Sequence, residues 1–128
     1  DPDNAWSDAK QQITPKTLDQ LTIDLKIRKE EGDALEYLNK LSNLRIQIDV
    51  VDHKLTEILG KRMKIADEIG GLKKKNNVAI LQNKRWNEIL SKMILEGKEF
   101  DLSEEFVLKI YKAIHQESIN HQKRLYDK

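Results

Sequence analysis

Apolar residues recur at alternating steps of three and four along the middle of the chain. This spacing is typical of the a and d positions of a coiled coil, and it predicts one long helix over about residues 35–75, roughly 60 Å at 1.5 Å per residue. The positions are Leu41, Leu44, Ile48, Val51, Leu55, Ile58, Arg62, Ile65, Ile69 and Leu72. Arg62 is the charged position in this seam, and its presence needs an explanation.

Residues that begin and end helices divide the rest of the N-terminal half. Thr14 and Pro15 are typical of an N-cap and a first helical residue, and leucines at helical spacing follow them. We expect this N-terminal helix to fade around Gly32. Asp33 is then placed to cap the long helix.

The long helix has a predicted weak point and a predicted partner. Gly70 and Gly71 interrupt it at about 1 kcal/mol each relative to alanine, and we expect a loop at residues 75–77. Two shorter helices cannot cover a stripe of this length, because much of it would project beyond them. Dimerisation through the long helix is therefore predicted.

The C-terminal half predicts two shorter helices. One covers about residues 83–96 with an apolar face, and Gly97 follows it as a plausible C′ residue. Ser103 is placed to cap the last helix, with two glutamates in its first turn. The stripe of that helix is Val107, Ile110, Tyr111, Ile114, Ser118, Gln122 and Leu125. The stripe therefore contains polar residues, as the long seam does.

Composition agrees with an all-α domain and excludes several classes of function. The 128 residues are 35% charged and 5% aromatic, with a net charge of +1. A near-neutral chain has no overall electrostatic reason to bind nucleic acid or an anionic membrane. There is no cysteine, no signal-peptide pattern and no apolar run of the roughly 20 residues needed to cross a bilayer. We expect a soluble, cytoplasmic protein.

Polar residues in the predicted seams share faces. Arg62 and Lys73 are eleven residues apart, which places them within about 20° of the same side of a helix. Ser118 and Gln122 form an i, i+4 pair. Gln82 and Arg85 likewise lie three residues apart, at the start of the second predicted helix. Arg62 and Lys73 can therefore line one cavity, and each of the other two pairs shares a face of its own helix.

Each of these residues also has a structural interpretation. A cation in a seam commonly sets the register or oligomeric state; Lys73 can be part of a solvated helix end, and Ser118 can bond back to the carbonyl one turn earlier. Their coincidence favours a ligand, because several buried donors without acids would each cost several kcal/mol. An anion with more than one carboxylate would supply the acceptors. The three histidines show no metal-ligand spacing, so no metal site is predicted.

The sequence LSNLRIQIDVVDHKLTEILGKRMKIADEIGGLK resembles the long first helix of the all-α chorismate mutases, with their L-R-x-x-I-D-x-x-D, L-x-x-R and G-x-x-K patterns. VAILQNKRWNEIL and AIHQESINHQKRL agree in order and spacing, so the resemblance covers about residues 38–128. It implies a three-helix fold in an intertwined homodimer. It also implies a Claisen rearrangement of chorismate to prephenate, in aromatic amino-acid biosynthesis, without a cofactor.

The resemblance also implies roles for individual residues. Arg62 would bind a substrate carboxylate, and Arg45 would reach the site of the other subunit; about 25 Å of helix between them agrees with this division. Lys73 and Gln122 match the donors to the ether oxygen. The positions that orient the other carboxylate are matched by Arg85 and Ser118.

Two positions depart from the family pattern. Gln82 stands where some members have aspartate, and Trp86 stands where many have a glutamate that accepts a hydrogen bond from the substrate hydroxyl. An indole donates but cannot accept. A backbone carbonyl or Gln82 remains as the acceptor, with both Gln82 and Trp86 kept among the substrate-binding residues.

The first residues, PDNAWSDAKQQITPKTLDQL, resemble the C-terminal end of the barrel in short-form 3-deoxy-heptulosonate-phosphate synthases. This similarity implies a mutase domain from a bifunctional enzyme, with residues 1–32 as barrel remnant and linker and residues 33–128 as the mutase. Trp6 would then lack its packing partner, and we expect the first dozen residues to be disordered or to pack on a neighbouring molecule. The alternatives are a non-catalytic helical dimerisation or regulatory module that senses a pathway acid for a fused synthase, and an isochorismate pyruvate-lyase.

Overall fold

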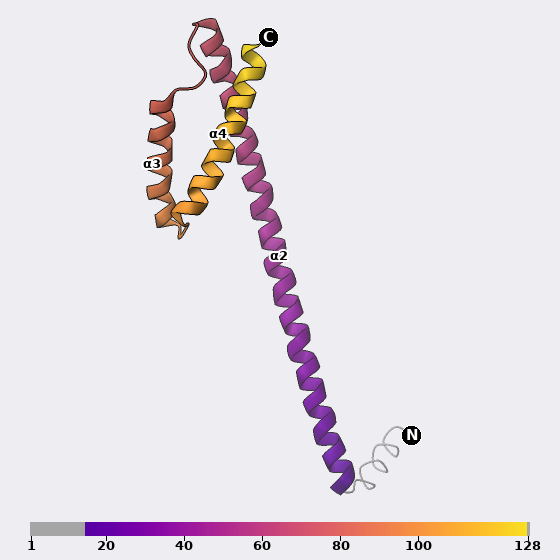
Figure 1. Ribbon diagram of the computed structural model, residues 1–128. Helices are drawn as coiled ribbons and strands as arrows, with labels where there is room; N and C mark the ends of the chain where they lie inside the picture. The colour runs from indigo at the N-terminus through magenta and orange to yellow at the C-terminus, as the bar shows by residue number, and fades with distance from the viewer. Residues whose placement is uncertain (1–14, 128) are drawn as a thin grey trace. The chain divides into compact units, whose positions relative to one another are not determined.

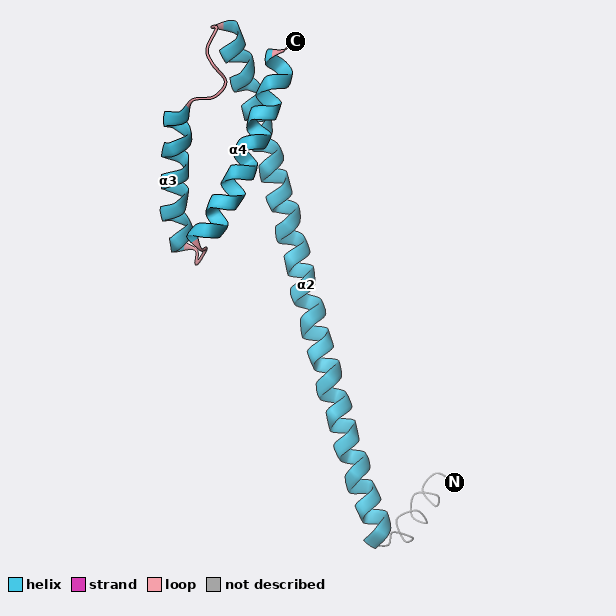
Figure 2. Cartoon of the chain, viewed as in Figure 1, coloured by secondary structure: helices cyan, strands magenta, loops and turns pink. Residues whose placement is uncertain are grey.

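The computed structural model describes the backbone of residues 15–127 and the side chains of residues 17–127. The described residues form three helices and no strand, which confirms the all-α prediction (Figures 1 and 2). The helices are α2 (Pro15–Lys75), α3 (Asn83–Glu99) and α4 (Glu104–Tyr126). The chain divides into two units, Asp1–Asp52 and His53–Lys128, and each is described by itself. Trp6 lies outside the described residues.

The N-terminal unit contains the first part of α2, which is one unbroken helix through Gly32. The prediction that a helix fades at Gly32, with Asp33 as a new cap, is therefore wrong. A glycine costs only about 1 kcal/mol inside a helix, and the surrounding leucine, lysine, arginine and glutamate residues are good helix formers. Local pairs add to this, including Lys40 with Glu36 at 2.9 Å.

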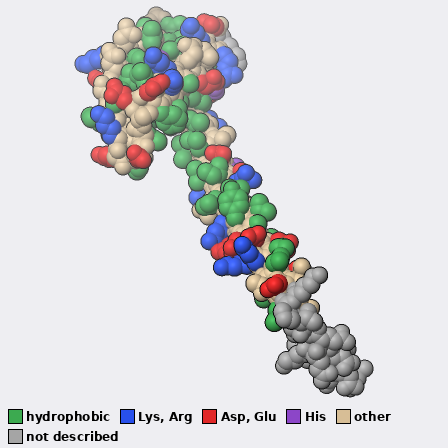
Figure 3. Space-filling view, turned by 60° about the horizontal axis from the view of Figure 1, so that its bottom comes forward, with side chains coloured by type: hydrophobic (Ala, Val, Ile, Leu, Met, Phe, Trp, Pro, Cys, Tyr) green, Lys and Arg blue, Asp and Glu red, His purple; other side chains and the backbone are tan. Residues whose placement is uncertain are grey.

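Apolar side chains of α2 are exposed in the single chain. Leu44 is 57% exposed, Leu55 53% and Ile58 60%, although all three belong to the predicted seam. Figure 3 shows apolar side chains at the surface among charged ones. None of the described helices is both long enough and apolar enough to cross a membrane.

The C-terminal unit has its core where helices meet at small residues. Ala66 and Val107 are each 4% exposed. Gly97 lies inside α3, is buried, and faces Val107: a Cβ on Gly97 would lie 2.6 Å from a Val107 methyl carbon. The prediction that Gly97 is the C′ residue is wrong, because α3 continues to Glu99 and Gly97 serves close packing with α4.

The connection from α3 to α4 is tight. The Leu102 N–H donates to the Gly97 carbonyl at 2.9 Å, and Asp101 has a φ of 58°. The Ser103 hydroxyl then accepts from the Phe106 N–H at 3.2 Å, which confirms Ser103 as the N-cap of α4.

The end of α2 packs against α4. The helix continues through Gly70 and Gly71 to Lys75, so these glycines do not interrupt it. A Cβ on Gly70 would lie 2.8 Å from the Gln122 Cα, whereas one on Gly71 would meet nothing within 4 Å. Gly70 therefore permits the close approach of α4. The turn that follows at Asn76 and Asn77 agrees with the predicted loop.

Candidate active site

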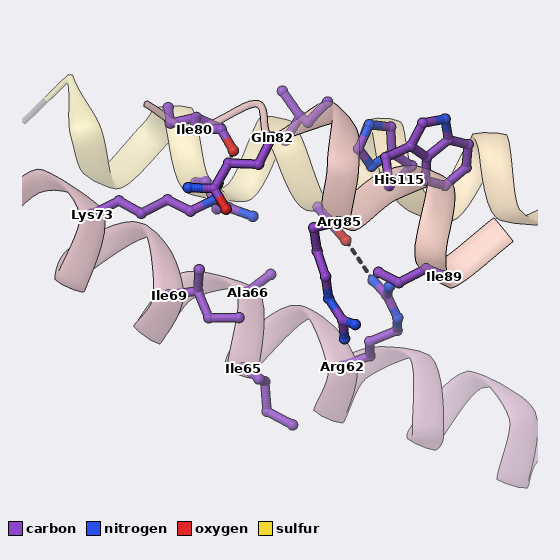
Figure 4. Close-up of a pocket in the computed structure, with 14 residues that line it drawn as sticks. Arg62, Ile65, Ala66, Ile69, Lys73, Ile80, Gln82, Arg85, Ile89 and His115 are labelled. Atoms are coloured by element: carbon purple, nitrogen blue, oxygen red, sulfur yellow. Dashed lines mark hydrogen bonds between the residues drawn. The ribbon is translucent and has the colours of Figure 1, made fainter. Parts of the chain in front are cut away.

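A cavity of about 470 Å³ lies in the C-terminal unit and is lined by all three helices and the loop before α3 (Figure 4). Its apolar wall consists of Ile65, Ala66, Ile69, Ile80, Ile89 and Ile119. Its polar lining consists of Arg62, Lys73, Gln82, Arg85, Trp86, His115, Ser118 and Gln122. The structure therefore brings seven of the eight predicted site residues together.

Lys73 and Gln122 meet at one end of the cavity. The Lys73 ammonium donates to the Gln122 side-chain carbonyl at 3.0 Å and to the Ile80 backbone carbonyl at 2.6 Å. Gln122 is buried at 8% exposure, and burial lowers the pKa of Lys73 from its usual value. Since Lys73 has three N–H bonds and two acceptors here, one remains for a ligand. The amide group of Gln122, whose oxygen is occupied, keeps its N–H₂ to donate.

Arg62 of α2 and Ser118 of α4 form a second contact, about three turns before Lys73 in α2. The Arg62 guanidinium donates to the Ser118 hydroxyl at 2.6 Å. Ser118 in turn donates to the Ile114 carbonyl at 2.9 Å, the back-bond to the preceding turn that the sequence suggested. This bond orients the hydroxyl so that its oxygen faces Arg62. The guanidinium keeps further N–H groups for a ligand.

Contacts of His121 beside the cavity hold α4 in position against α2. The His121 imidazole lies 2.9 Å from an Asp67 carboxylate oxygen, across the two helices, and 3.2 Å from Glu117 on its own helix. The two α4 residues that make these contacts, Glu117 and His121, directly precede Ser118 and Gln122 in the sequence. They help to hold Ser118 and Gln122 toward Arg62 and Lys73.

Three lining residues come from the start of α3. Gln82 is the N-cap residue, is exposed, and makes no side-chain capping bond. Arg85 extends into the cavity from the wall opposite Arg62 (Figure 4), and its contact with Glu88 is long, at 3.8 Å, and exposed. Trp86 is half-buried. The predicted i, i+3 relation of Gln82 and Arg85 thus places both on the cavity.

His115 is a lining residue that sequence reasoning missed. Its imidazole stacks on the Trp86 indole, with ring centroids 4.0 Å apart and an interplanar angle of 18°. Burial, together with the positive charges of Arg62 and Lys73, lowers the pKa of His115 below its usual value. A signal was present, because His115 precedes Ser118 by three residues and Gln122 by seven, and so shares their face of α4.

Arg45 is the predicted site residue that does not line this cavity. It is an exposed residue of α2.

The cavity is electropositive and suited to an anion. Among the described residues that line it, three are cations and none is aspartate or glutamate. No cluster of described residues has the composition to hold a metal ion. Converging donors without acids suit a ligand with several negative oxygens, held by charge-assisted hydrogen bonds.

Comparisons with known proteins agree with this geometry. Residues 44–123 match the chorismate mutase type II family. The chain belongs to this family of isomerases, and the match covers the cavity and the last half of α2.

The chain is also similar to parts of longer proteins. It is 32% identical over 90 residues to a bifunctional chorismate mutase/prephenate dehydratase of Buchnera aphidicola from Acyrthosiphon pisum, covering 70% of this chain and 23% of that protein. An Aquifex aeolicus protein of the same name is 30% identical over 91 residues, covering 69% of this chain and 25% of that protein. The chain thus spans about a quarter of these relatives. The comparison with solved structures finds no match.

Proposed function

We propose that this chain catalyses the rearrangement of chorismate to prephenate, and that the cavity is its active site. The observation that carries the proposal is the pair of donors left by Lys73 and Gln122. The Lys73 ammonium lies 3.0 Å from the side-chain oxygen of Gln122, and each of the two groups keeps at least one N–H. Both can therefore donate to one oxygen of a ligand. That position suits the ether oxygen, where negative charge grows as the carbon–oxygen bond breaks.

The carboxylates of the substrate would be held by arginines. Arg62, steadied by Ser118, binds one of them, and Arg85 reaches the other from α3. Binding both ends fixes the folded conformer from which the new carbon–carbon bond forms. The rearrangement requires no proton transfer from the protein, which agrees with a lining that is rich in donors and, among the described residues, contains no carboxylate.

The active form would be an intertwined homodimer. The exposed fractions of Leu44, Leu55 and Ile58 are those of a stripe that lacks its cover. A second copy of α2 would supply the missing apolar surface. Arg45 of the second copy would then complete the site from outside.

The resemblance of the first twenty or so residues to a synthase barrel supports a fused synthase in the full-length protein, with the mutase domain from residue 33 onward. The relatives described above bear the name of a different fused activity, a dehydratase. The synthase origin therefore rests on the resemblance of residues 2–21 alone.

The test follows chorismate absorbance with the purified 128-residue chain. We expect loss of chorismate with one equivalent of prephenate formed. Saturable binding without loss would contradict catalysis and favour a regulatory module that senses a pathway acid. Release of pyruvate from isochorismate, with no prephenate from chorismate, would favour a lyase.

A further inference from the structure

We propose that His115 is the specificity residue for the ring hydroxyl of the substrate, accepting the hydroxyl hydrogen on an imidazole nitrogen. This inference rests on the function proposed above. It assigns a role to a residue whose position the family resemblance leaves without one.

The argument begins from the acceptors that the cavity offers. Arginine, lysine and tryptophan side chains donate only. The carbonyl of Gln122 and the backbone carbonyl of Ile80 already accept from Lys73, and the Ser118 oxygen accepts from Arg62. The lining side chains with an acceptor atom that accepts from no other described residue are Gln82 and His115, and a hydroxyl that enters this cavity meets no competing donor at either.

Burial and orientation favour His115 over Gln82. The Gln82 side chain is exposed at the N-terminus of α3, where water competes for its amide oxygen. His115 is half-buried and its ring plane is fixed by the stack on Trp86. Trp86 thus contributes a flat surface that holds the acceptor, although its own indole cannot accept.

The protonation state of His115 suits an acceptor. Arg62 and Lys73 face it from α2, and Arg85 lines the same cavity from α3, while no carboxylate among the described residues lines the cavity. Burial, together with the positive charges of Arg62 and Lys73, lowers the pKa of the imidazole, so one ring nitrogen keeps a lone pair at neutral pH. A protonated ring would only donate.

The first test compares chorismate with its analogue that lacks the ring hydroxyl, in the wild-type chain and in His115→Phe. Phenylalanine keeps an aromatic ring for the stack and removes the acceptor. We expect the variant to lose roughly 10- to 100-fold in kcat/KM for chorismate and little for the deoxy analogue. His115→Gln, which restores an acceptor, should recover part of the preference for chorismate over the deoxy analogue. Gln116→Ala, one residue along on the exposed side of α4, should preserve it.

The second test needs no variant. The preference of the wild-type chain for chorismate over the deoxy analogue should fall as pH drops from about 8 to about 5, with an apparent pKa below the usual histidine value. The kcat/KM for the deoxy analogue should not fall over this pH range, because a protonated His115 attracts a dianion. A preference that is constant with pH, or one that is lost in Gln82→Met and kept in His115→Phe, would overturn the assignment. Absence of chorismate turnover by the wild-type chain would instead overturn the proposed function itself.

Discussion

Gly70 of α2 and Gln122 of α4 are in direct contact, with room for no side chain between them. A Cβ on Gly70 would lie 2.8 Å from the Gln122 Cα and 3.1 Å from its Cβ. The same α4 turn carries the carbonyl that accepts from Lys73 at 3.0 Å. The missing side chain at Gly70 therefore allows the two proposed donors to meet.

Gly70→Ala should destabilise the chain by about 1–3 kcal/mol, because overpacking against backbone atoms outweighs the roughly 1 kcal/mol gained in helix propensity. Its matched control is Gly71→Ala, which meets nothing within 4 Å and should be neutral or stabilising. Urea denaturation measures both. Equal stabilisation by the two substitutions would show that α4 does not need this approach.

Lys73→Ala should lower kcat/KM for chorismate by about 10² to 10³ while the fold is kept, as is typical for loss of one preorganised donor. Lys75→Ala, an exposed lysine at the end of the same helix, should stay near the wild-type rate. Steady-state kinetics and far-ultraviolet circular dichroism check the two halves of this prediction. Near-normal turnover by Lys73→Ala would remove Lys73 from its proposed role.

The alkaline side of the pH profile should report on Lys73. Burial lowers its pKa, so the ammonium donor is lost as pH rises through a value below the usual one near 10.4. We expect kcat/KM, which reflects the free enzyme, to fall at lower pH than kcat, because a bound dianion favours the charged lysine. Coincident alkaline limbs for the two parameters would contradict this.

Arg45→Ala and Arg62→Ala should each be nearly inactive. Mixed after subunit exchange, they should regain up to about a quarter of the activity of the same number of wild-type sites, because half of the chains form mixed dimers and each holds one intact site. A fluorescence assay must demonstrate exchange first. Exchange without recovery would contradict a site that combines Arg62 of one subunit with Arg45 of the other.

Ile58→Asp should weaken the dimer at least about 100-fold, since it buries an unpaired charge in the predicted seam. The matched control is His53→Asp, an exposed position on the opposite side of α2, which should leave association nearly unchanged. Sedimentation equilibrium compares the two. Dimers of equal strength would show that α2 does not associate through this stripe.

The sequence by itself determined the all-α class, the cap of α4 and which polar residues share a helix face, since these follow from periodicity and local bonds. Ser103 caps α4 as predicted because a side-chain oxygen three residues ahead of an N–H depends only on local geometry. Arg62 and Lys73 share one face of α2, and Ser118 and Gln122 share one face of α4, because residues at these spacings point the same way. The packing of α4 against α2 then brings the two pairs into one cavity.

Only the tertiary structure decided what the glycines do and which rings meet. Gly97 and Gly70 looked like helix breakers, yet each lies within a helix and permits close packing with α4. The stack of His115 on Trp86 joins residues 29 positions apart, and no local pattern encodes such a distance. A glycine weakens its own helix slightly but allows two helices to approach closely. The stabilisation from that close packing exists only once both helices are formed.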